Sequence, residues 1–289
     1  MVMGRGILGW LGPVDFLQQP HQRAPLGCGQ AGCGLQLQFG GGGFNGTVAS
    51  ADPSLLGEGY AMIASSGGND NPVSGVFALN EAALNDYAYL SVHRTSQAAH
   101  EIVQGFYGQQ ESKRYFEGCS NGGREGLIAA QRWPDDFDGI IARAPALDFQ
   151  NIFLGFNKTF KNISLPGGNI PEAKIPALHA AVLAACDAQD GIEDGIIGQP
   201  AACQFNIDSM ACTGAETDAC LTEAQITTAR GLYEPYAIEG KNTFLGFNFG
   251  SEGGWSGSQT GTITAMSPVF SNMFATGWVR YFVTRDAGF

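Results

Sequence analysis

The sequence predicts an α/β fold in which a mostly parallel sheet forms the core and a large inserted region follows it. Strand-like segments alternate with helix-like segments between residues 35 and 142, as in parallel sheets that are covered by helices. A G-x-S-x-G motif at 118–122 lies between one strand-like and one helix-like segment. After Pro145 the alternation stops, and Gly, Asn, aromatic residues and Cys become frequent.

These changes in pattern predict three regions. We expect an atypical N-terminal segment at 1–34, a partial α/β core at 35–149 and an inserted lid domain at 150–289. The chain of 289 residues with 44% hydrophobic content is long enough for such an organisation.

A net charge of −12, with only 15 Lys and Arg, argues against nucleic acid or an anionic membrane surface as a partner. No apolar run is long enough to span a membrane.

The first predicted strand, 35–39, alternates apolar and polar residues and leads directly into a glycine run at 40–46. Backbone N–H groups in such a loop can approach a developing oxyanion closely because glycine has no Cβ. We therefore predict an oxyanion loop in which Gly42 or Gly43 donates. A phosphate-binding loop would end in Gly-Lys-Ser/Thr, which is absent here, and a plain flexible loop is the remaining alternative.

The next elements continue the alternation. Residues 60–68 are predicted to form a buried strand that ends in a loop, and 84–107 a helix that stops at Gly108. His93 and His100 lie on this helix, ahead of the motif serine. We interpret both as structural or surface histidines.

The G-x-S-x-G motif predicts a nucleophile elbow with Ser120 as the nucleophile. The strand-like segment 113–117 precedes it, and helix-like sequence follows as far as Trp133; a further strand is predicted at 139–142. The amide N–H of Asn121 would be the second oxyanion donor. A simple Gly/Ser loop is the alternative, since 42 glycines make the bare motif easy to obtain by chance.

A loop at 186–197 follows a predicted helix at 171–186 and places Asp187, Asp190 and Asp194 three and four residues apart. Carboxylates on a tight glycine-containing loop suit Ca²⁺, although the spacing is not that of an EF-hand. A solvated Asp/Gly turn remains an equally good interpretation of the spacing alone.

The seven cysteines predict disulfides more readily than a zinc site, because no C-x-x-C pair is present. Cys186 with Cys203 and Cys212 with Cys220 enclose short loops, and Cys28 with Cys33 is a further candidate pair. Cys119 is left over and would be a buried free thiol. Asn-x-Ser/Thr triplets at Asn45, Asn157 and Asn162 agree with export.

Residues 118–127, with 130–140 and 144–146, resemble the serine block of the tannase and feruloyl esterase family. The resemblance implies an α/β-hydrolase core with a lid, secretion, and hydrolysis of esters of hydroxylated aromatic acids through a serine acyl-enzyme. Substrates would be small aromatic esters or plant cell-wall and polyphenol esters. It also implies a structural lid calcium held by the carboxylates of Asp187, Asp190 and Asp194 and the carbonyls of Ile192 and Ile196.

A serine hydrolase of this fold needs an acid and a histidine after the serine, and only His179 follows Ser120. We expect His179 to be a poor base, since nothing in the sequence orients it. The resemblance places the acid and histidine beyond the lid, with a cysteine that bonds Cys119. We therefore expect a C-terminal truncation and weak hydrolysis; the alternative function is an inactive calcium-binding fragment.

Lid aromatics such as Trp255 would line an acyl pocket or form the lid core.

Overall fold

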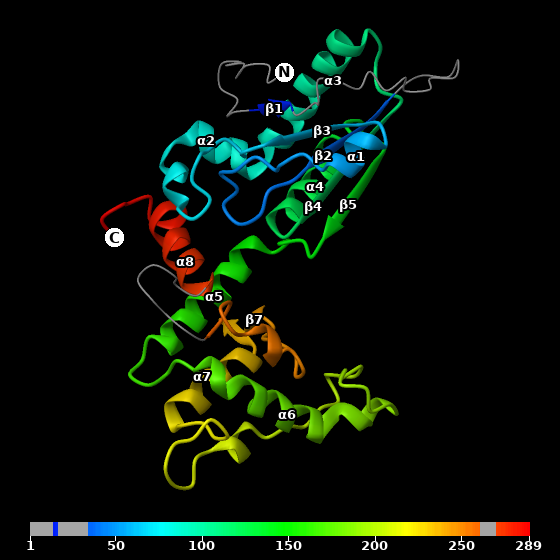
Figure 1. The fold of residues 1–289 in the computed structure, drawn as a ribbon. Helices are drawn as coiled ribbons and strands as arrows, with labels where there is room; N and C mark the ends of the chain where they lie inside the picture. Colours follow the sequence, from blue (N-terminus) through cyan, green and yellow to red (C-terminus); the bar gives the residue numbers. More distant parts are fainter. Residues whose placement is uncertain (1–13, 17–33, 261–269) are drawn as a thin grey trace. The chain divides into compact units, whose positions relative to one another are not determined.

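A computed structural model describes residues 14–16, 34–260 and 270–289 (Figure 1). It divides into two compact units, the first formed by Met1–Leu147 with Val279–Phe289 and the second by Asp148–Trp278. The expected Cys28–Cys33 pair and most of the segment 1–34 lie outside the described residues. The second unit begins close to the expected lid boundary, but the last eleven residues (Val279–Phe289) belong to the first unit.

The first unit contains a five-stranded sheet in the order β1-β3-β2-β4-β5. Its strands are β1 (Val14–Phe16), β2 (Leu35–Phe39), β3 (Tyr60–Ser65), β4 (Lys113–Cys119) and β5 (Gly139–Arg143). All pairs are parallel except β1 with β3, which is antiparallel. The predicted α/β class with a mostly parallel sheet is confirmed.

Helices follow the strands as the alternation predicts. They are α1 (Pro53–Gly57), α2 (Glu81–Asn85), α3 (Ser91–Tyr107) and α4 (Asn121–Arg132), with a 3₁₀ turn at Gly75–Leu79. Val92 of α3, Phe116 of β4 and Ala129 of α4 share one buried cluster with Phe137. At β5, in contrast, Ile141 stays 58% exposed, so the described residues leave that side of the edge strand uncovered.

The helix expected at 84–107 begins earlier and is interrupted. After α2, residues Asp86–Leu90 form a π-helical turn that leads into α3, which ends as expected with Gly108 in the left-handed conformation. The wide turn carries carbonyls that Arg124 satisfies, because its guanidinium donates to Tyr87 O and Ala88 O at 2.9 and 2.8 Å. A partner 36 residues away in the chain thus stabilises a local irregularity that periodicity does not show.

The second unit is mainly helical. It contains α5 (Phe149–Ile163), α6 (Ile175–Cys186), α7 (Glu223–Tyr233), α8 (Phe270–Gly277) and a small hairpin of β6 (Tyr236–Ile238) and β7 (Lys241–Phe244). Short 3₁₀ turns lie at Glu172–Lys174, Asp187–Asp190, Ile207–Met210 and Glu252–Gly254. A π-helical turn, Trp278–Val283, follows α8, and its residues after Trp278 belong to the first unit. The α-helix expected from residue 171 starts at Ile175 instead. Pro176 is then in its first turn, a position that proline favours.

A buried core and two disulfides hold this unit together. Leu178, Val182 and Leu232 are almost fully buried in its core, as is Trp255, which supports the core interpretation of that aromatic. Both disulfides of the predicted inserted region, Cys186–Cys203 and Cys212–Cys220, are present.

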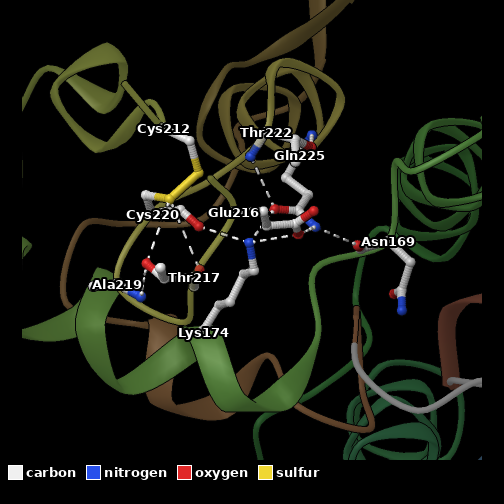
Figure 2. Close-up of polar contacts among 9 residues, drawn as sticks. All are labelled: Asn169, Lys174, Cys212, Glu216, Thr217, Ala219, Cys220, Thr222 and Gln225. Carbon is white, nitrogen blue, oxygen red and sulfur yellow. Dashed lines mark hydrogen bonds and ion pairs between the residues drawn. A yellow bond between two sulfur atoms is a disulfide. The ribbon is translucent and has the colours of Figure 1, made fainter. Parts of the chain in front are cut away.

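The ammonium of Lys174 is a hub beside the second disulfide. Figure 2 shows it surrounded by three acceptors: Cys220 O at 2.7 Å, Gln225 Oε1 at 3.0 Å and Glu216 Oε1 at 2.8 Å. The Lys174 side chain is only 3% exposed, and these partners take the place of water around the buried ammonium. The neighbouring ammonium lowers the pKa of Glu216 below its usual value.

Candidate active site

Ser120 lies on a strained turn between β4 and α4. Its φ of 60° and ψ of −117° fall outside the regions that non-glycine residues favour. Hydrogen bonds hold this conformation: Ser120 N donates to Arg143 O at 3.0 Å, and Ser120 O accepts from Arg124 N and Ala146 N, each at 3.1 Å. This is the backbone geometry of a nucleophile elbow.

The glycines around Ser120 are required by close backbone contacts. A Cβ added to Gly118 would lie 2.4 Å from the carbonyl of Gly122, and one added to Gly123 would lie 2.5 Å from Arg143 O. On the other side, Gly122 packs against Gly40 of the glycine loop, where an added Cβ would meet backbone at 3.0 Å. The elbow and the glycine loop therefore touch through their main chains.

The glycine loop continues from β2, and its first two N–H groups are hydrogen-bonded while the next two are not. Gly40 N donates to Glu117 O at 2.9 Å, and Gly41 N donates to Glu125 Oε2 at 3.0 Å. Within the described part of the chain, Gly42 N and Gly43 N have no acceptor, and the space around Gly42 is open. These two N–H groups are the ones that the sequence predicted as oxyanion donors.

A buried polar network joins this loop to the elbow. Asn121 Nδ2 donates to Gly41 O at 3.2 Å and to Glu125 Oε1 at 3.0 Å. Arg124 donates to Asn121 Oδ1 through Nε and Nη2, at 2.9 and 2.6 Å. Tyr87 OH donates to Gly43 O at 2.9 Å from the π-helical turn. Burial raises the pKa of Glu125 to about 7, although Arg124 and the hydrogen bonds from Gly41 and Asn121 oppose the shift; burial also raises the pKa of Tyr87.

The sequence prediction missed the roles of Tyr87, Arg124 and Glu125. A weak signal existed for Glu125, because an acidic residue four positions after Asn121 on a helix lies on the same face.

Asn45, one of the three possible glycosylation sites, is buried. Its side chain is only 2% exposed, so the folded chain does not present it to solvent.

Comparison with known proteins identifies the family. The family model described as "Tannase and feruloyl esterase" matches residues 34–289. The chain belongs to this family.

Individual members show how much of their length the chain matches. It is 34% identical over 225 residues to a probable feruloyl esterase B-2 of Aspergillus flavus, covering 76% of this chain and 43% of that protein. Among solved structures, feruloyl esterase B from Aspergillus oryzae superposes with a TM-score of 0.75 at 32% identity, over 88% of this chain and 51% of that one. An esterase from the same organism gives 0.76 at 29% identity, over 90% and 51%. The chain thus spans about half the length of these tannase and feruloyl esterase relatives.

In this member of the family, each histidine in the described residues is paired with a carboxylate. His93 Nδ1 lies 2.7 Å from Asp136, and His100 Nδ1 lies 2.6 Å from Glu111. His93 also stacks on Trp133. Both therefore have structural partners, in line with the interpretation from sequence.

His179 requires a correction. The sequence offered nothing to orient it, but Glu252 Oε2 lies 2.8 Å from its Nδ1. Tyr233 OH and Gly250 N donate to the other oxygen of this fully buried carboxylate, at 2.7 and 2.9 Å. The sequence separation of 73 residues explains why the pair was missed.

Cys119 is free, as expected, but it is exposed and not buried. It ends β4, where Glu117 forms an ion pair at 2.5 Å with Arg143 of the neighbouring strand. The resemblance to the family implied a disulfide for Cys119, and that pairing stays a prediction.

The predicted calcium loop folds back on itself through Asp side chains. Asp187 Oδ2 accepts from Gly195 N and Asp194 Oδ1 from Ile196 N, while Asp190 accepts from Ile192 N and Gly198 N. Asp187 Oδ1 is buried and has no hydrogen-bond partner, which suits a hard cation. However, no group of three or more His, Cys, Asp or Glu among the described residues is arranged to hold a metal.

No helix among the described residues combines the length and the apolar character that a membrane span needs.

Proposed function

We propose that this chain carries the nucleophile and the oxyanion-binding groups of a carboxylic ester hydrolase that acts through Ser120. The observation that carries the proposal is the strained Ser120 turn packed directly against a glycine loop with free N–H groups. Strain of this kind is characteristic of functional sites, because the surrounding contacts must hold it in place.

The chemistry follows from the groups present. Ser120 Oγ would attack the ester carbonyl, and the alcohol would leave as the acyl-enzyme forms. The N–H of Asn121, at the first position of α4, has no intrahelical acceptor and would hold the oxyanion with Gly42 or Gly43. Water would then release the carboxylic acid and restore the serine. We assign no general base, because His93 and His100, the described histidines of the first unit, hydrogen-bond to Asp136 and Glu111 and not to Ser120.

The substrate class is proposed from the family. Relatives named as feruloyl esterases indicate esters of hydroxylated aromatic acids, including plant cell-wall and polyphenol esters. The acidic chain and the two disulfides of its described residues agree with an exported enzyme that meets such substrates.

A serine-directed fluorophosphonate probe tests the proposed nucleophile. We expect labelling of the purified chain that disappears in Ser120→Ala and persists in Ser112→Ala, a matched change of another serine. Equal labelling of the wild type and Ser120→Ala would overturn the assignment. Release of the acid from methyl ferulate and methyl gallate would then compare acyl groups.

We also propose that the loop 187–196 binds calcium as a structural ion. Asp187, Asp190 and Asp194 would supply carboxylate oxygens, and Ile192 and Ile196 would supply main-chain carbonyls. The buried unpartnered oxygen of Asp187 supports this proposal, as does the Cys186–Cys203 disulfide beside the loop. The alternative of an inactive calcium-binding fragment is not favoured, because the strained elbow has no purpose in it.

A further inference from the structure

Glu125 is a buried acid whose contacts are all made near the proposed site. It lies one turn into α4, is only 5% exposed, and uses both carboxyl oxygens as acceptors. One oxygen binds the N–H of Gly41, and the other binds the amide of Asn121, the residue after the proposed nucleophile. A Cβ added to Gly40 would come within 2.9 Å of the same carboxyl, so the loop lies directly on it.

The contacts around Glu125 fix the direction of the peptide groups in the loop. Asn121 Nδ2 holds Gly41 O, and Tyr87 OH holds Gly43 O. In a trans peptide the C=O and the following N–H point in opposite directions. Binding of the Gly41 carbonyl by Asn121 therefore sets the direction of the Gly42 N–H, one of the proposed oxyanion donors.

The orientation of the Asn121 amide depends on its two charged neighbours. Arg124 donates to its oxygen, and Glu125 accepts from its nitrogen. Reversing the amide would put like groups together at both ends, which is unfavourable in a buried site. Glu125 thus acts on the loop twice, directly through Gly41 N and indirectly through Asn121.

We propose that Glu125 is a positioning residue that holds the glycine loop in the arrangement needed for ester hydrolysis at Ser120. This inference rests on the proposed function of Ser120. Glu125 does not contact the reacting atoms; it fixes the backbone that would. A purely stabilising role would not require its partners to be the loop backbone and the residue after the serine.

Two variants separate positioning from stability. Glu125→Gln keeps one acceptor for Gly41 N–H, and Glu125→Leu keeps none. The control is Glu111→Leu, which removes another buried acid of the same unit that binds His100 and lies away from the loop. For each chain we would measure the melting temperature, the rate of fluorophosphonate labelling and amide hydrogen exchange across residues 40–46.

We expect Glu125→Leu to lower the labelling rate on the order of 100-fold, the effect of a small misplacement of catalytic groups. Exchange at Gly41 should accelerate in the same variant, and Glu125→Gln should fall between it and the wild type in both measurements. Glu111→Leu should lower the melting temperature without these changes. Unchanged exchange at Gly41 in Glu125→Leu would overturn the positioning role, whatever the labelling shows. Absence of labelling in the wild type would instead count against the proposed function.

Discussion

The imidazole of His179 lies 2.8 Å from the carboxylate of Glu252, which is completely buried in the second unit. The same carboxylate accepts from Tyr233 OH, and burial together with this negative charge raises the pKa of Tyr233. Glu252→Leu would leave several buried donors without an acceptor. We expect it to lower the free energy of unfolding by about 3 kcal/mol, and Glu252→Gln by less. Urea denaturation of both, compared with the exposed Glu172→Gln, checks this; equal midpoints would contradict it.

Removing the Lys174 ammonium should loosen the loop closed by Cys212–Cys220. Lys174→Met keeps much of the apolar stem but removes the ammonium that donates to Cys220 O; Gln225 Oε1 keeps only the bond from Thr222 N (Figure 2). We expect a loss of about 2 kcal/mol in the free energy of unfolding, together with faster proteolysis in the loop 212–220. The exposed Lys161→Met is the matched control. A variant as stable and as resistant as that control would show that the hub has no structural role.

The close contact between Gly118 and Gly122 predicts a large effect of a single methyl group. Gly118→Ala would force a Cβ to within 2.4 Å of the Gly122 backbone, which cannot move without disrupting α4. We expect a loss of about 3 kcal/mol or more, at the upper end for point changes. In contrast, Gly105→Ala in α3 meets nothing within 4 Å and should stabilise by up to about 1 kcal/mol. Thermal unfolding of the two variants should therefore shift in opposite directions.

The raised pKa of Glu125 predicts a dependence of stability on pH. Its value of about 7 in the folded chain exceeds the ordinary 4.5, so the folded state holds this proton more tightly. The resulting stability is fully present below pH 4.5 and is lost as the pH rises through 7. Glu125→Gln cannot titrate, so the wild type should lose stability relative to the variant over this interval. Denaturation at several pH values measures the difference; a constant difference would contradict the assignment.

Calcium should stabilise the second unit if the loop 187–196 binds it. We expect added Ca²⁺ to raise the melting temperature of the wild type and chelation to lower it, because the ion would offset repulsion among the three carboxylates. Asp190→Ala and Asp187→Asn should abolish most of the response, while Glu193→Gln should retain it. A melting curve that does not respond to chelation would identify the loop as a solvated turn.

The sequence by itself determined those features that depend on neighbouring residues. The nucleophile elbow is local, because strand, glycines and helix must follow one another within 113–132 to produce the strained Ser120. The same holds for the glycine loop after β2 and for the Cys212–Cys220 loop, whose cysteines are only eight positions apart. The repeating strand and helix pattern was sufficient to predict the α/β class.

Only the tertiary structure decided how distant polar groups pair. The contacts of Glu125 with Gly41, of Arg124 with Tyr87 and of His179 with Glu252 join residues 84, 37 and 73 positions apart. The periodicity of the sequence does not predict such pairs, because each of these polar residues taken alone could equally lie on a solvated surface. Burial makes the pairing obligatory, since an unsatisfied charge or donor inside the protein is costly. The exposure of Cys119 and the π-helical turn at 86–90 were likewise set by what packs beside them.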